Sequence, residues 1–252
     1  MDPNQYKFMF EVEDQHWWYV GNHEIFLELL NKHSILKKGI NVLDAGCGTG
    51  KWLEILKKTN EINETGIDYN PIALDYARTR GKLNLEQADI NDCDLKIFYY
   101  DLITSFDVIC SRHVSDKLAL KKMHSWLKDD GYLLLTVPAY QFLLSKHDDA
   151  VHQNKRYSKK QIRIFLESQG FEIIKISYNV CLLFPVAFIK RIIDKLTLSK
   201  KTEHNEVKMP CRFINSLFLK VMRIEKLMMR YSSLPFGLSV MVLAKKTSKI
   251  TE

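Results

Sequence analysis

The chain has 252 residues, of which 46% are hydrophobic and 27% charged, a composition typical of a globular protein with one α/β domain or one such domain carrying an insertion. Its five cysteines are odd in number and form no C-x-x-C pair, which argues against a disulfide framework and for a reducing cytosol, and the polar, acidic residues 1–14 lead us to expect no signal peptide. The net charge of +7 is unevenly divided, since residues 1–150 carry 17 basic and 23 acidic side chains and residues 151–252 carry 20 and 7, which favours an acidic partner for the second part.

Apolar spacing predicts a helix over residues 15–38, which starts with the aromatic run His16-Trp17-Trp18-Tyr19. Beyond it, near-continuous apolar segments alternate with helical ones. We expect strands at 41–44, 64–68, 83–88, 106–110, 132–137, 171–178 and 239–244, with a helix at 158–169 before the sixth. This alternation predicts a doubly wound, mostly parallel sheet that is covered by helices on both faces.

The stretch VLDAGCGTG at residues 42–50 is the most informative motif of the chain. An apolar strand leads into Asp44 and then into glycines at the alternate positions 46, 48 and 50, followed by a helix. A glycine turn between a buried strand and a helix brings backbone N–H groups close to a ligand. Dinucleotide-binding loops have the pattern G-x-G-x-x-G, but Lys51 fills the place of their third glycine.

Two acids follow at the ends of the next predicted strands. Asp68 lies 20 residues beyond the glycine loop, where an acid can accept hydrogen bonds from ribose hydroxyls. The pair Asn70-Pro71 after it is typical of a helix start, with Asn70 as the cap. Asp89 comes directly after the third predicted strand. The order of loop, first acid and second acid is more specific than any one of them alone.

This D-x-G-x-G-x-G loop with its two acids resembles the class I methyltransferases that depend on S-adenosylmethionine (SAM). The resemblance implies a seven-stranded sheet whose last strand is antiparallel, a loop that wraps the methionine end of SAM, ribose binding by Asp68, and adenine binding by Asp89 and the N–H of Ile90. The cofactor-binding residues that we expect are Tyr19, Asp44, Gly46, Cys47, Gly48, Gly50, Asp68, Tyr69, Asp89, Ile90 and Ser111.

The acceptor site of this fold lies beyond strands four and five. After strand four the chain lacks the Asn/Asp-Pro-Pro-aromatic tetrad of nucleobase amino-methyltransferases, and His113 is either a base or a helix cap. The loop after strand five resembles that of a bacterial subgroup of small methyltransferases, which implies His147 or His152 as the base. The substrate contacts that we expect are Tyr140, Asp148, Arg156 and Tyr157. We assign no metal, because nothing sets a ligand geometry around His147, Asp148 and His152.

A helical insertion is predicted between the last two strands. Its first ten residues, 180–189, are apolar and are followed by a basic flank, and residues 213–230 form a second basic amphipathic stretch. Ten apolar residues are too few to span a bilayer. The insertion is therefore either a lid over the acceptor pocket, which we favour, or a contact with an anionic membrane surface. The predicted units are a helical cap (1–38), a SAM-binding core (39–179), the insertion (180–232) and the final strand with its tail (233–252).

The sequence thus predicts a cytoplasmic, SAM-dependent methyltransferase, peripheral at the membrane if the insertion binds there. The acceptor that we expect is an oxygen, in preference to a nitrogen, of a small or lipid-linked molecule. The basic second part keeps an RNA methyltransferase open as an alternative. The atypical segment after strand four keeps open a non-catalytic protein that binds SAM or serves as a membrane adaptor.

Overall fold

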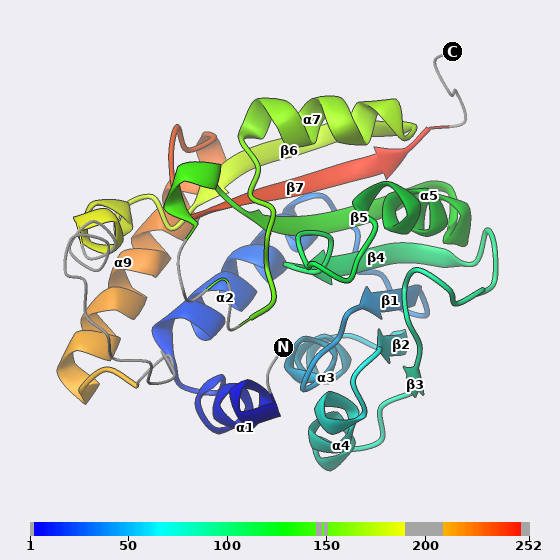
Figure 1. The fold of residues 1–252 in the computed structure, drawn as a ribbon, viewed down its shortest axis with the longest axis horizontal. Coiled ribbons are helices and arrows are strands. Elements are labelled where there is room, and N and C mark those ends of the chain that lie inside the picture. Colours follow the sequence, from blue (N-terminus) through cyan, green and yellow to red (C-terminus); the bar gives the residue numbers. More distant parts are fainter. Residues whose placement is uncertain (1–2, 145–147, 149–150, 190–208, 248–252) are drawn as a thin grey trace.

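One seven-stranded sheet organises the molecule, in the strand order β3-β2-β1-β4-β5-β7-β6 (Figure 1). The computed structural model describes residues 3–144, 148, 151–189 and 209–247. Strands β1 to β5 pair in parallel, and β7 is antiparallel to both β5 and β6. The predicted doubly wound sheet with an antiparallel last strand is confirmed.

The described elements follow one another in the predicted order. The strands are β1 (Asn41–Ala45), β2 (Asn63–Asp68), β3 (Leu85–Gln87), β4 (Tyr100–Phe106), β5 (Leu127–Pro138), β6 (Phe171–Asn179) and β7 (Ser239–Lys246). The helices are α1 (Pro3–Val12), α2 (Trp17–Lys32), α3 (Lys51–Thr59), α4 (Pro71–Thr79), α5 (Asp116–Trp126), the 3-10 turn η1 (Gln141–Leu143), α7 (Lys159–Ser168) and α9 (Arg212–Tyr231). Residues 184–189 are also helical.

Strand order places a crevice between β1 and β4. From β1 the chain builds outward through β2 and β3, and it then returns to pair β4 with the other side of β1. Parallel strands around such a reversal leave a crevice at their carboxyl ends, where ligands bind in open α/β sheets. The buried side chains of Leu43, Leu102, Ile103 and Leu134 are 0% exposed and hold these central strands between the layers.

The predicted position of the fourth strand is wrong. The sequence predicts it at 106–110, but β4 spans Tyr100–Phe106 and therefore ends where the predicted strand begins. Two hydroxyl residues, Thr104 and Ser105, interrupt the run of apolar residues that is typical of a buried strand. Both are 0% exposed, and Thr104 Oγ donates to Asp44 Oδ1 at 2.7 Å while Ser105 Oγ donates to the Ala45 carbonyl at 3.0 Å. The shift moves Asp107 from the interior of a strand to its end, at the crevice.

The helix start predicted at Asn70 is confirmed, whereas the helix predicted over 15–38 spans Trp17–Lys32. Asn70 caps α4 by accepting from the Ile72 N–H at 2.9 Å, with Pro71 in the first turn. The insertion between β6 and β7 is helical over residues 184–189 and 212–231, and α9 packs against α2, as Figure 1 shows. Residues 190–208 of the insertion lie outside the described residues.

Candidate active site

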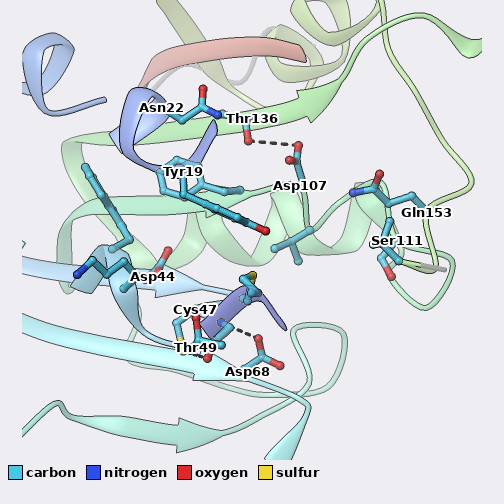
Figure 2. A pocket seen from close by; sticks show the side chains of 18 of the residues that line it. Tyr19, Asn22, Asp44, Cys47, Thr49, Asp68, Asp107, Ser111, Thr136 and Gln153 are labelled. Atoms are coloured by element: carbon cyan, nitrogen blue, oxygen red, sulfur yellow. Dashed lines mark hydrogen bonds between the residues drawn. The ribbon is translucent and has the colours of Figure 1, made fainter. Parts of the chain in front are cut away.

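A cavity of about 480 Å³ opens at the carboxyl ends of β1, β2 and β4, and it also reaches the end of β5 (Figure 2). Thirteen of the residues that the sequence nominated line it: Tyr19, Asp44, Gly46, Cys47, Gly48, Asp68, Tyr69, Asp89, Ile90, Ser111, His113, Asp148 and Arg156. They come from six separate segments of the chain. The fold therefore brings the two predicted groups, for cofactor and for acceptor, to one continuous space.

Other nominated residues lie outside the lining. The Tyr157 hydroxyl donates to Asp116 at 2.7 Å, and Tyr140 stacks on Tyr178 with ring centroids 5.1 Å apart. Gly50 packs against Ala77 of α4. The ring centroid of His152 lies 5.5 Å from that of His113, and His113 is exposed at the rim of the cavity. His147 lies outside the described residues. Two of the three candidate bases, His113 and His152, are among the described residues, and of these two His113 lines the cavity.

The glycine loop is tied to the neighbouring strand by its own backbone. The N–H groups of Gly46 and Cys47 both donate to the Ile67 carbonyl, at 2.8 and 2.9 Å, and the Gly48 N–H donates to Asp68 Oδ2 at 2.9 Å. Gly46 has φ +87°, and a Cβ there would stand 2.3 Å from a methyl group of Val108. Glycine is needed at this position on both counts, conformation and space.

Burial makes two acids of the cavity, Asp44 and Asp68, hard to ionise. It raises the pKa of Asp44 to about 7, against the stabilising hydrogen bond from Thr104, and the nearby charge of Asp68 adds to the rise. It also raises the pKa of Asp68, although the N–H groups of Gly48 and Asn70 favour its carboxylate. Asp44 and Asp68 are 2% and 7% exposed. A cationic ligand would stabilise these carboxylates, because an opposite charge nearby favours the ionised form.

Asp107 is a cavity residue that sequence reasoning missed. It follows β4 directly, with a left-handed backbone at φ +57°, and its N–H donates to the Thr136 carbonyl at 3.0 Å. Thr136 Oγ in turn donates to Asp107 Oδ1 at 3.3 Å, so β5 holds both ends of this residue. Burial raises the pKa of Asp107 to about 6. Figure 2 shows its carboxylate and the Tyr19 hydroxyl facing the same space above the glycine loop.

The wall beyond Asp107 contains a buried ion pair. Arg156 donates through Nε to Asp148 Oδ1 at 3.1 Å and through Nη1 to the Ala139 carbonyl at 2.9 Å. Its side chain is 3% exposed and that of Asp148 is 1% exposed. Arg156 thus neutralises Asp148 and anchors its loop to the end of β5. The charge of Arg156 also favours the carboxylate of nearby Asp107.

The first helix covers the cavity from outside the sheet. Gln5, Tyr6 and Met9 of α1 line it together with Trp52 of α3. Within the described part of the chain, Gln5 Nε2 and Trp52 Nε1 are buried without a hydrogen-bond partner, and the two residues are 5% and 3% exposed. Buried donors of this kind normally have partners. Two such donors at a cavity with buried acids suit a ligand that carries both acceptor groups and positive charge.

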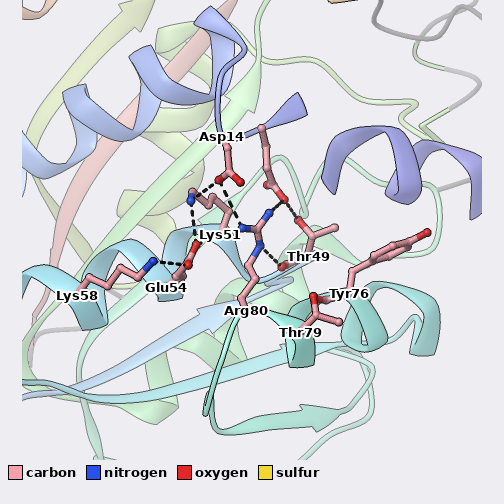
Figure 3. Close-up of polar contacts among 9 residues, drawn as sticks. Asp14, Thr49, Lys51, Glu54, Lys58, Tyr76, Thr79 and Arg80 are labelled. Atoms are coloured by element: carbon pink, nitrogen blue, oxygen red, sulfur yellow. Dashed lines mark hydrogen bonds and ion pairs between the residues drawn. The ribbon is translucent and has the colours of Figure 1, made fainter. Parts of the chain in front are cut away.

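Arg80 connects this cover to the glycine loop, as Figure 3 shows. Its guanidinium donates to Glu13 at 2.6 Å, to Glu54 at 3.1 Å and to the Thr49 carbonyl of the loop at 2.9 Å. The Thr49 hydroxyl donates to Glu13 as well. The side chains of Arg80 and Glu13 are 5% and 4% exposed, so this is a buried ion pair. We call Arg80, Glu13 and Thr49 the α1 clasp.

Comparisons with known proteins agree with this geometry. A family model described as a methyltransferase domain matches residues 19–176. Phosphoethanolamine N-methyltransferase 1 of Triticum aestivum is 30% identical over 167 residues, which are 60% of this chain and 32% of that protein. Ribosomal protein L11 methyltransferase of Thermosipho africanus is 32% identical over 107 residues, 40% of this chain and 38% of that protein. The chain thus spans about a third of the length of these curated relatives.

Solved structures share the fold at low sequence identity. Phosphoethanolamine N-methyltransferase 2 of Haemonchus contortus, solved in complex with S-adenosyl-L-methionine, has a TM-score of 0.59 at 16% identity and covers 89% of this chain and 52% of that one. A SAM-dependent methyltransferase of Archaeoglobus fulgidus has a TM-score of 0.56 at 20% identity, with 89% and 94% covered. At such identities the likeness concerns the fold.

Proposed function

Because the chain belongs to the family of class I methyltransferases that depend on SAM, we propose that it transfers the methyl group of SAM to a nitrogen or oxygen of a small-molecule acceptor. One observation carries this proposal. Asp44, Asp68 and Asp107 stand at the ends of β1, β2 and β4 around one cavity, which the glycine loop also borders. Buried acids beside unpartnered donors fit a ligand with a sulfonium, an ammonium and several acceptor atoms.

The cofactor residues follow from this placement. Within the described residues, each oxygen of Asp68 accepts one hydrogen bond, from Gly48 or Asn70, and we assign the remaining lone pairs to ribose hydroxyls. Asp89 and the N–H of Ile90 are assigned to adenine, and Gln5 and Trp52 to remaining acceptor atoms of the ligand. When bound, SAM supplies an electrophilic methyl group. The chain's own task is to hold donor and acceptor in line and to exclude water, which α1 does by covering the cavity.

Replacing Asp68 by Ala is expected to weaken SAM binding by about 1.5–3 kcal/mol, because ribose hydroxyls lose a charged acceptor. Isothermal titration calorimetry measures this. Asp75→Ala on α4 is the matched control, since that carboxylate is exposed and pairs with Arg78 away from the cavity. Equal affinity of the Asp68 variant and the wild type would remove Asp68 from the cofactor site.

The acceptor is proposed from the far end of the cavity. Asp107, with its pKa raised to about 6, is the carboxylate placed to take the acceptor's proton near neutral pH. A carboxylate also attracts a protonated amine, and several curated relatives are named for N-methylation of phosphoethanolamine. We therefore propose a small amine as the first acceptor class to assay. An oxygen acceptor, which the sequence had favoured, is the second.

Cofactor affinity is expected to rise with pH up to about neutrality. Burial raises the pKa of Asp44 from its ordinary value of 3.8 to about 7, so below about pH 7 the free protein holds a proton there. A cationic ligand favours the ionised form, so binding at lower pH must release that proton. Calorimetry at about pH 5.5 and about pH 8 should show tighter SAM binding at the higher pH, and Asp44→Asn should reduce the difference between the two affinities.

The same proton affects the stability of the ligand-free protein. Its free energy of unfolding should fall as pH rises from about 4 to about 7, because in this range the folded chain retains the proton of Asp44 and the unfolded chain does not.

One labelling experiment tests the function as a whole. The protein is incubated with cell extract and SAM labelled in its methyl group, and label is then counted in small-molecule, lipid, RNA and protein fractions. Label in the small-molecule fraction supports the proposal. Label confined to RNA would support the nucleic-acid alternative, and tight SAM binding without transfer into any fraction would support a non-catalytic SAM-binding protein.

A further inference from the structure

The outward side of α9 carries a row of exposed apolar side chains. Phe213, Leu217, Ile224, Met228 and Tyr231 are separated by four, seven, four and three residues, so they share one side of the helix. Their exposed fractions lie between 40% at Met228 and 85% at Tyr231. A helix of 20 residues is about 30 Å long, and the row follows nearly all of it. We call these five residues the α9 row.

The opposite side of α9 already has a partner. Met222 and Met229 are buried, and the Met222 side chain packs so closely on α2 that a Cβ at Gly21 would stand 2.8 Å from it. The core therefore satisfies one apolar side of the helix, and the α9 row is a second apolar side. Large apolar side chains gathered on an exposed surface usually mark a contact with another molecule or a membrane.

A second exposed apolar segment is attached to the middle of this helix. Glu225 of α9, which is 0% exposed, accepts from the N–H groups of Cys181 and Leu182 at 2.7 and 3.1 Å. The segment that starts there exposes Leu182, Val186 and Ile189 by 40–58%. Figure 1 shows it beside α9 at the same end of the molecule. Two segments at this end, α9 and residues 182–189, thus expose apolar side chains, and Glu225 connects them.

Charges on α9 favour an anionic surface as the occupant. Its single acid, Glu225, is buried, whereas Arg212, Lys220, Arg223 and Arg230 are exposed and Lys226 is partly so. Lys220 falls within the α9 row, between Leu217 and Ile224. The charges nearer the core pair with α2: Arg223 and Lys226 contact Glu24, and Arg230 contacts Glu28. The exposed part of α9 therefore combines apolar and basic side chains and presents no acid.

We propose that α9 and residues 182–189 dock on an anionic lipid bilayer, with the α9 row at the level of the headgroups and acyl chains. An interfacial helix binds by burying its apolar side while basic side chains contact anionic lipids. Within the described residues, no helix is long and apolar enough to cross a bilayer. The opposite, inner side of α9 adjoins the cavity wall, because Trp17 of that wall packs on Phe218 with ring centroids 5.3 Å apart.

Vesicle flotation of the full chain tests the docking. Wild-type protein is expected to float with vesicles of phosphatidylcholine and phosphatidylglycerol, less with phosphatidylcholine alone, and less as salt is raised. The double variant Leu217→Glu/Ile224→Glu should bind at least about tenfold more weakly, because two apolar side chains are lost from the contact. Ile164→Glu on α7 is the matched control, since Ile164 is 56% exposed and Ile224 is 54% exposed.

Three results would overturn the proposal. The first is that the wild type does not float with anionic vesicles at low salt. The second is that the Ile164 control loses as much vesicle binding as the double variant. The third is that light scattering shows a dimer of the wild type and a monomer of the double variant, which would assign the α9 row to a contact with a second copy of the chain. SAM titration of the same variants keeps this test separate from the proposed function, since docking variants should bind SAM as the wild type does.

Discussion

Asp107→Asn is expected to lower kcat about 10²- to 10⁴-fold, the usual contribution of a positioned proton acceptor. The amide keeps the shape of the side chain, and its oxygen can still accept from Thr136 Oγ, so the local backbone should stay in place. SAM affinity should change little by comparison. Stability should be equal or higher, because burial disfavours the charged form of Asp107 and the amide carries no charge.

Kinetics with an amine acceptor and labelled SAM measure this effect. Asp101→Asn is the matched control: it changes the same residue type near the start of β4, where Asp101 pairs with Lys128 outside the cavity. In the wild type, kcat/KM should rise with pH through the region of about 6. A loss confined to KM would contradict proton removal by Asp107 and would assign its carboxylate to acceptor binding instead.

Arg80→Ala is expected to cost about 3–5 kcal/mol of folding or α1-docking free energy, because it leaves Glu13 buried without its cation. Burial already raises the pKa of Glu13, and Arg80 and Thr49 oppose that rise. Without Arg80 the carboxyl should take up a proton more readily. The cost should therefore shrink as pH falls, since the protonated form carries no charge to compensate.

Chemical denaturation and amide hydrogen exchange of α1 distinguish global from local loss. The double variant Glu13→Gln/Arg80→Ala should recover part of the stability, because the buried charge is removed along with its partner. Arg78→Ala is the control on the same helix, since Arg78 is half exposed, pairs with Asp75 and should cost under about 1 kcal/mol. If Arg78→Ala and Arg80→Ala cost the same, the α1 clasp does not stabilise the cover.

Sequence reasoning predicted the fold correctly where backbone conformation is encoded locally. The glycine loop needs positive φ at Gly46 and close approach to Val108, and Asp68 ends the short strand β2, whose last three residues are buried. Each signal lies within a few residues of the feature that it predicts. The seven strands and the antiparallel β7 followed from the family resemblance, and the pairing of β7 with β5 and β6 confirms the antiparallel strand.

The missed features depend on contacts that are distant in the sequence. Thr104 and Ser105 are suitable in a buried strand only because β1 accepts from their hydroxyls, and this displaced the predicted strand and concealed Asp107. The α1 clasp joins residues 13, 49 and 80, which no local pattern connects. Tyr157 shows the reverse case: its sequence neighbour Arg156 reaches the cavity, while its own hydroxyl is bound to Asp116 on α5.

The acid-rich lining of the cavity also bears on turnover. Donating a methyl group converts a positively charged sulfonium into a neutral thioether, so the spent molecule is attracted less strongly to carboxylates than the fresh one. Asp44 and Asp68, the two acids assigned to the cofactor end of the cavity, would thus discriminate between the two forms of the same nucleoside by charge alone. With SAM held as proposed, this difference in charge favours exchange of the spent molecule for a fresh donor.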